Sequence, residues 1–399
     1  MSETVRRPAA AGPAQPAATR QRYLAPDLAR GTMLLIVALV HAHMFLAGSA
    51  SVLRGYPPDG AGVDAVVAAL LTVFADGRSY PMFSALFGYG LTQIALRQEA
   101  SGWDWPKTRR LLRRRGRWLL VFGLLHLLLL FSGDILGTYG IIALVFVGLL
   151  RASDRRILRH SAVWFVLGSV TYGVMLFAAA AGPGPENSSA LFMLDDPVQD
   201  ALYRIATWPV GTPLFVVTSV CPFLVGVWAA RRRVLEEPER HLVLLRRTAL
   251  VGIAVTVLGG LPLALVTSGV WADPAPGPAI AVGILHTASG YAGGFGYAAL
   301  VALVAWRIGT ARGPVVTAVA ACGQRSLSCY LLQSVAWIVL FAPYTVDLGS
   351  RIGVAASAVV GFGVWLGTVL VAELLRRLDS RGPAESLLRR LSYGAKPAA

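Results

Sequence analysis

Long apolar runs alternate with short basic segments along this chain. In the clearest case, a basic run at 107–117 precedes two apolar runs, 118–131 and 135–150, and arginines return at Arg151. Each run of about 15 residues can cross most of a ~30 Å hydrocarbon layer as a helix. Because Lys and Arg collect on the cytoplasmic side, the pattern predicts a transmembrane hairpin whose outer turn is Ser132-Gly133-Asp134.

The same reading extends to the whole chain and predicts an all-α, polytopic membrane bundle of about ten spans with both termini in the cytoplasm. The expected spans are 31–47, 62–97, 118–131, 135–150, 162–181, 209–230, 249–270, 279–306, 326–341 and 352–375. The second run is too long for one straight span and contains Asp-Gly-Arg-Ser-Tyr-Pro at 76–81, which predicts a broken or re-entrant helix.

The two ends of the chain differ from this middle part. Residues 1–22 are rich in Ala, Pro, Gln and Arg without apolar periodicity, so we expect disorder there. Residues 23–378 are expected to form a single transmembrane domain. Residues 379–399 are expected to form a cytoplasmic tail at the membrane interface, because Leu387, Leu388 and Leu391 share a helical face.

Composition supports a membrane protein and excludes most other classes. Of the 399 residues, 55% are hydrophobic and 14% are charged, whereas soluble domains carry about 25% charged residues. The net charge of +15 comes from basic residues that flank apolar runs, so topology and anionic lipid explain it better than nucleic acid does. We expect multi-pass insertion in a bacterial cytoplasmic membrane, with the lipid bilayer as the main partner.

Ionisable residues inside spans are candidate functional residues, because burying each in lipid costs roughly 3 kcal/mol. Arg30 and His41 are eleven residues apart, which places them on one helix face about 16 Å apart along the axis. Arg30 could hold a phosphate or carboxylate, and a neutral His41 could take a proton from a hydroxyl. The alternative is that Arg30 is a basic flank paired with Asp27 and His41 is a buried hydrogen-bonding histidine.

Other polar residues have a structural and a functional interpretation as well. His126, near mid-depth, either lines the same cavity as His41 or holds two helices together. Asp134 is expected first to cap the following helix. Cys322 and Cys329 are expected to pack, and neither a metal site nor a permanently bound cofactor is predicted. Small-residue pairs at Gly133/Gly137, Gly290/Gly294 and Gly363/Gly367 predict close helix contacts.

Several stretches together resemble the YeiB-like family of bacterial inner-membrane proteins, known as domain-of-unknown-function family 418. The matching stretches are Asp-Leu-Ala-Arg-Gly at 27–31, 83–90, Gly-Leu-Leu-His at 123–126, Gly-Asp-Ile-Leu at 133–136, Tyr-Gly at 139–140, 323–334 and Gly-Pro-Ala-Glu at 382–385. This chain departs from the family pattern at Cys329 and at His41, where typical members have Asn. The family is similar in architecture to transmembrane acyltransferases, whose first helix carries an Arg and a His separated by ten residues, as Arg30 and His41 are here.

The resemblance implies an acyltransferase-like activity on a hydroxyl acceptor. The donor would be an acyl-CoA-type thioester, bound as a substrate with its phosphates near Arg30 and Arg325. His41 would act as general base, with His126 orienting it or stabilising the oxyanion. We expect Asp134 and Gln333 in the substrate site and a lipid or glycan as acceptor. The alternatives are a transporter, with Asp76 and Arg78 at a midplane site, and a non-catalytic scaffold.

Overall fold

The computed structural model describes residues 23–47, 55–57, 60–181 and 194–394, and every regular element in these ranges is helical. The expected all-α class is therefore confirmed, while the disorder expected for residues 1–22 lies outside the described residues. The elements are α1 (Leu24–His43), α2 (Val63–Phe74), α3 (Ser79–Ala100), α4 (Trp105–Leu129), α5 (Leu136–Val145), η3 (Phe146–Arg151), α6 (Asp154–Ala181), α7 (Pro197–Arg231), η4 (Pro238–His241), α8 (Leu242–Thr267), α9 (Pro276–Ile308), α10 (Pro314–Gln324), α11 (Ser326–Phe341), η5 (Leu348–Ser350), α12 (Val354–Arg377) and α13 (Pro383–Tyr393).

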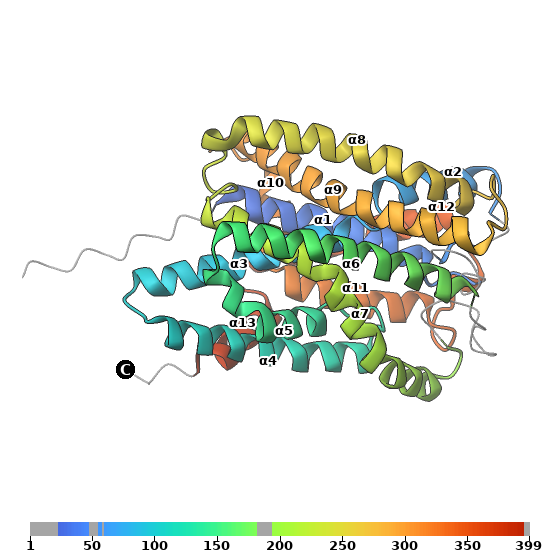
Figure 1. Cartoon of the computed structure of the whole chain (residues 1–399). Helices are drawn as coiled ribbons and strands as arrows, with labels where there is room; N and C mark the ends of the chain where they lie inside the picture. Colours follow the sequence, from blue (N-terminus) through green and yellow to red (C-terminus); the bar gives the residue numbers. More distant parts are fainter. Residues whose placement is uncertain (1–22, 48–54, 58–59, 182–193, 395–399) are drawn as a thin grey trace, which may run out of the picture.

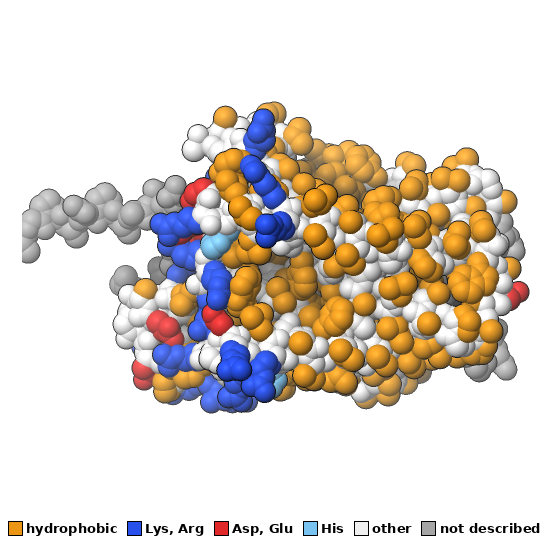
Figure 2. Space-filling model, turned by 45° about the horizontal axis from the view of Figure 1, so that its top comes forward, with side chains coloured by type: hydrophobic (Ala, Val, Ile, Leu, Met, Phe, Trp, Pro, Cys, Tyr) orange, Lys and Arg blue, Asp and Glu red, His pale blue; other side chains and the backbone are white. Residues whose placement is uncertain are grey.

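The long helices run side by side in one bundle, with α8 and α9 along one edge and α4 and α13 along the opposite edge (Figure 1). Lys and Arg gather at one end, and hydrophobic side chains cover most of the remaining visible surface (Figure 2). Exposed apolar residues such as Leu250 (74%) and Leu258 (68%) on α8 would be unfavourable in water. This surface fits a helical protein whose solvent is lipid.

Six described helices are long and apolar enough to cross a membrane: α1, α6, α7, α8, α9 and α12. A seventh is added if α10 and α11, which meet at 86°, count as one bent span. The protein is therefore a multi-pass membrane protein, while the count of about ten spans stays a prediction. The assignment of the basic end to the cytoplasm also rests on the charge pattern alone.

The predicted interruption of the second span is present between α2 and α3. Around it, Arg78 is fully buried and donates from Nε to Thr256 Oγ1 (2.9 Å), while its Nη1 lies 2.9 Å from His286 Nε2. Asp76 accepts a hydrogen bond from the Tyr56 hydroxyl (2.5 Å). The two charged side chains at the break thus find polar partners inside the protein, as membrane depth requires.

Helix α7 begins at Pro197, twelve residues before the expected span at 209–230. The Asp196 carboxylate caps it by accepting from the backbone N–H groups of Val198 and Gln199, and Pro197 suits the first helical turn. Asp200 and Arg204 form a buried ion pair one turn apart. Both residues precede the expected span, and their pairing on one helix face lets this segment continue as helix.

Prolines do not end α7, although Pro209, Pro213 and Pro222 lie inside it. Because proline has no N–H, Pro222 leaves the carbonyl of Thr218 without its helical donor. The hydroxyl of Tyr291 on α9 donates to that carbonyl at 2.7 Å. A side chain from a neighbouring helix therefore replaces the missing backbone bond.

The small-residue pairs differ in what they pack against. A Cβ atom on Gly290 would lie 2.6 Å from the Gly77 carbonyl oxygen, so α9 approaches the α2–α3 break closely, as predicted. Gly133 and Gly137 contact the turn between α4 and α5, with a Cβ on Gly137 placed 3.0 Å from Asp134 Oδ2. The prediction is wrong for Gly363 and Gly367, because both are exposed on α12 and no described atom would lie within 4 Å of an added Cβ.

Candidate functional site

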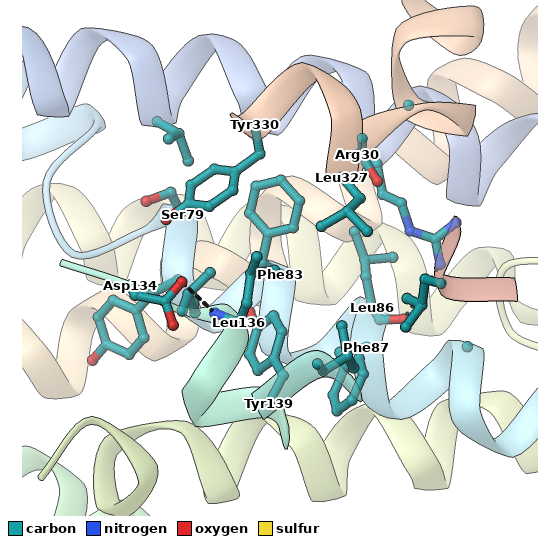
Figure 3. Close-up of a pocket in the computed structure, with 18 of the residues that line it drawn as sticks. Arg30, Ser79, Phe83, Leu86, Phe87, Asp134, Leu136, Tyr139, Leu327 and Tyr330 are labelled. Atoms are coloured by element: carbon teal, nitrogen blue, oxygen red, sulfur yellow. Dashed lines mark hydrogen bonds between the residues drawn. The ribbon is translucent and has the colours of Figure 1, made fainter. Parts of the chain in front are cut away.

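A single cavity of about 1860 Å³ extends from the basic end of the bundle into its interior. Of the residues expected in the site, Arg30, His41, Asp134 and Arg325 line it. Figure 3 shows Arg30 on one side and Asp134 on the other, with Phe83, Leu86, Leu136, Tyr139 and Tyr330 among the side chains between them. The cavity therefore has a charged mouth, an apolar middle and a polar inner part.

Helix α1 carries two of these residues at different depths. Arg30 lies 3.5 Å from the Asp27 carboxylate and donates from Nη2 to the Leu86 carbonyl (3.4 Å). The ring of His41 packs against Phe131, with 4.7 Å between ring centroids. The pairing of Arg30 with Asp27 is present, as the structural interpretation expected, and both Arg30 and His41 nevertheless face the same cavity.

His126 lies behind the cavity wall, and both of its ring nitrogens have partners. Its Nδ1 lies 2.9 Å from Asp134 Oδ1 and its Nε2 lies 2.8 Å from Ser334 Oγ. The rings of Phe131 and Tyr330, whose centroids are 6.4 Å and 5.0 Å from that of His126, separate it from the cavity. His126 is not among the lining residues. In the structure its ring nitrogens contact Asp134 and Ser334, and a role in catalysis stays a prediction.

Asp134 caps the following helix and also lines the cavity. Its Oδ1 accepts from the Leu136 N–H (3.1 Å) and its Oδ2 accepts from the Gly137 N–H (2.6 Å), which confirms the expected cap of the following helix, α5. With His126 on Oδ1 as well, three of about four lone-pair positions of the carboxylate are used. Oδ2 can accept one further hydrogen bond from a ligand.

Gln333 was expected in the substrate site, but it does not line the cavity. It is buried between α1 and α11, and its Nε2 donates to the Leu34 carbonyl at 3.3 Å. This geometry makes Gln333 a contact between two helices in the described part of the chain. A role in binding substrate stays a prediction.

Arginines dominate the mouth of the cavity. Those that line it are Arg30, Arg97, Arg115, Arg233, Arg325, Arg376, Arg381 and Arg389. Burial lowers the pKa of the Arg115 guanidinium below its ordinary value, while Tyr393 opposes the effect and the nearby charge of Arg30 adds to it. An anion bound in this mouth would relieve that repulsion. The mouth is thus suited to a phosphate-bearing group.

The tail helix α13 forms part of this mouth. Glu385 accepts hydrogen bonds from the N–H groups of Leu327 (2.8 Å) and Ser328 (3.1 Å) at the start of α11. Arg325, at the α10–α11 bend, donates from Nε to the Ser380 carbonyl (3.1 Å). Leu388 is buried, whereas Leu387 is 49% exposed, so only part of the expected apolar face packs inward. These contacts give the Gly-Pro-Ala-Glu motif a physical role, which is to dock the tail.

Sequence reasoning did not single out several residues of the inner cavity. Tyr139 and Tyr330 lie within the stretches that carry the family resemblance, so that signal could have identified them. Trp208 had no signal, because a lone tryptophan in an apolar run is ordinary. Ser334 does not line the cavity but contacts His126 behind it, and it lies in the same matching stretch as Tyr330. Ser334 is 208 residues from its partner His126, so only the tertiary fold joins them.

Comparison with known proteins finds one matching family model and two similar full-length proteins. Residues 229–395 match the family described as a protein of unknown function (DUF418). The chain is 25% identical to the uncharacterized protein YxaH of Bacillus subtilis, with 95% of this chain and 96% of that protein aligned. It is 26% identical to the uncharacterized protein YeiB of Escherichia coli, over 94% of this chain and 97% of that protein. The resemblance read from the motifs is thus confirmed: the chain is similar along its length to YeiB and YxaH, and its carboxyl-terminal part matches the DUF418 family.

Proposed function

We propose that this protein transfers an acyl group from a thioester donor, entering from the basic end, to a hydroxyl acceptor inside the bundle. The observation that supports this most is that Arg30 and His41, three turns apart on α1, line one cavity. The membrane would be the bacterial cytoplasmic membrane, with the basic end inside. The donor is a substrate of the acyl-CoA type, and its phosphates would lie among the arginines of the mouth.

The chemistry needs one base and one anchored donor. The neutral imidazole of His41 takes the proton of the acceptor hydroxyl while the hydroxyl oxygen attacks the thioester carbonyl carbon. The carbon–sulfur bond then breaks, and the leaving thiolate takes the proton back from the imidazolium. Arg30 binds the donor about 16 Å from His41 along α1, which fixes how deep the reactive end reaches.

The other site residues would hold neighbouring groups in place and would not take part in the reaction. His126 holds Asp134 through the Nδ1 contact of 2.9 Å, and Asp134 faces the cavity with one free acceptor position. Arg325 bonds backbone carbonyls of Ala321 and Ser380, so it shapes the mouth through the tail. Contact between Arg325 and donor phosphate would require the tail to shift.

The test is thioester turnover by the purified full-length protein in lipid nanodiscs. Release of free thiol from an acyl-CoA in the presence of a hydroxyl acceptor should fall about 100-fold or more in His41→Ala, because a general base contributes that much. His160→Ala is the matched control, since His160 lies on α6 outside the cavity lining. Unchanged thiol release and acyl transfer in folded His41→Ala would refute the role of His41.

A transporter is the second candidate, because Gly77 and Ser79, at the α2–α3 break, line the same cavity. Broken helices that face a cavity are the usual substrate sites of secondary transporters. In proteoliposomes, uptake of a solute without consumption of thioester, reduced in Ser79→Ala and retained in His41→Ala, would favour transport over acyl transfer.

A further inference from the structure

The two halves of the cavity differ in charge. All arginines that line it lie at the mouth, and no lysine lines it within the described residues. In the inner part, Asp134 is the charged lining residue, and the two arginines near this end, Arg78 and Arg204, point into the protein, where Thr256 and Asp200 bind them. An anion would therefore meet a carboxylate there and no lining cation.

Polar atoms without protein partners cluster around Asp134. The Tyr139 hydroxyl, the Trp208 indole N–H and the Ser132 hydroxyl have no hydrogen-bond partner among the described residues, and all three residues line the cavity. A Cβ on Gly137 would lie 3.0 Å from Asp134 Oδ2 and 3.8 Å from Trp208 Nε1, which shows that these two atoms are neighbours. Unpaired buried polar groups are unfavourable, so this set is suited to a ligand with several hydrogen-bonding groups.

Aromatic faces complete this part of the cavity. Phe87 and Tyr139 are stacked, with ring centroids 4.6 Å apart and planes 9° from parallel. Tyr330 and Phe131 stand nearby, because both contact His126 behind Asp134. Flat apolar surfaces beside a few convergent donors and acceptors orient a ring that has both apolar faces and polar edges.

We propose that the inner part, defined by Asp134, Tyr139 and Trp208, is a binding site for a neutral sugar ring. The ring's hydroxyls would donate to Asp134 Oδ2 and accept from the Trp208 N–H and the Tyr139 hydroxyl. A simple long-chain alcohol would leave most of these groups unpaired, and an acidic sugar would face the Asp134 carboxylate. The identification of this sugar as the acyl acceptor rests on the proposed function; its binding does not.

The experiment measures binding without any thioester, using the full-length protein in nanodiscs and saturation-transfer NMR. The probes are methyl β-glucoside, methyl β-galactoside, glucuronate and cyclohexylmethanol, each at about 10 mM, enough to detect millimolar affinity. At least one neutral glycoside should bind, and glucuronate and cyclohexylmethanol should bind at least fivefold more weakly. Absence of binding by both neutral glycosides, or equal or tighter binding of glucuronate, would overturn the proposal.

Two matched variants locate the site. Trp208→Phe keeps the aromatic face and removes the N–H, so it should weaken glycoside binding about fivefold, the loss expected for one hydrogen bond. Trp228→Phe is the control, because Trp228 also has an unpartnered indole N–H among the described residues but does not line the cavity. Equal binding by wild type and Trp208→Phe would place the sugar elsewhere and refute the proposal.

Further arms separate this site from the proposed reaction and identify the source of the sugar. Glycoside binding by the wild type, with no acyl transfer from a thioester to any acceptor, would support the sugar site and refute the acyltransferase. Acyl transfer to a plain alcohol without glycoside binding would support the acyltransferase and refute the sugar site. A glucosyl diacylglycerol in the nanodisc that displaces methyl glucoside would indicate a lipid-linked sugar, and failure to displace it would indicate a soluble one; both support the site.

Discussion

Two helix breaks in this protein each place an arginine at the bend, and their surroundings differ. Arg78, between α2 and α3, is completely buried and bonds a side chain and a backbone carbonyl of α8 and a side chain of α9. Arg325, between α10 and α11, is 7% exposed and bonds only backbone carbonyls in the contacts described above, one of them in the tail. The first break is a fixed joint of the bundle, whereas the second is the attachment point of a peripheral helix.

The largest effect is expected at the fixed joint. Arg78→Met keeps much of the side-chain volume but leaves Thr256, His286 and the Asp76 carbonyl without their donor, so the free energy of unfolding should fall by about 3–5 kcal/mol. Thermal unfolding of the protein in nanodiscs measures this loss. Arg351→Met, at an exposed position before α12, should leave the unfolding temperature unchanged. An equal loss in both variants would show that the hydrogen bonds of Arg78 stabilise the fold no more than an exposed arginine does.

A smaller effect is expected at the tail. Glu385→Gln removes the charge that accepts from the Leu327 and Ser328 N–H groups and should weaken docking of α13 by about 1 kcal/mol. Trypsin cleavage after Arg389 or Arg390 should then rise about fivefold, because the local opening equilibrium shifts. Global unfolding should change little. Glu239→Gln, at an exposed position in η4, is the control, and the same cleavage rate in both would contradict the docking role of Glu385.

The smallest effect is expected for Arg325→Lys, which keeps the charge but loses the paired contact with the Ser380 carbonyl. Tail cleavage should rise by about two- to threefold, equivalent to roughly 0.5 kcal/mol. Arg312→Lys, exposed between α9 and α10, should have no effect. A loss of global stability as large as that of Arg78→Met would mean that both breaks are fixed joints.

The two breaks also show what the sequence reveals. The first was predictable, because Gly77 and Pro81 occur together with the charged Asp76 and Arg78 inside an apolar run. The second was missed, because the only local mark is Gly323, whose importance is tertiary: an added Cβ there would lie 1.7 Å from the Asp27 carbonyl of α1. Local chemistry marked one bend, and a contact between distant segments produced the other.

The candidate site divides in the same way. Arg30 and His41 were predictable because one helix carries both at a spacing that fixes their common face. The cap formed by Asp134 was also predictable, because its partners are only two and three residues further along the chain. The partnership of His126 with Ser334, and the place of Trp208 beside Asp134, depend on how α11 and α7 pack against α4 and α5, and helical periodicity within one segment carries no information on such pairings.

Because Tyr291 donates to the Thr218 carbonyl, the residues suited to positions 222 and 291 depend on each other, although the two positions lie on separate helices. Alanine in place of Pro222 would restore a backbone N–H that competes for the Thr218 carbonyl oxygen. The buried Tyr291 hydroxyl would then lose this acceptor. Phenylalanine at position 291 would instead leave the Thr218 carbonyl without a hydrogen-bond donor. Descendants of this sequence should therefore exchange the proline and the tyrosine together, and a change at one site alone should be the rarer event.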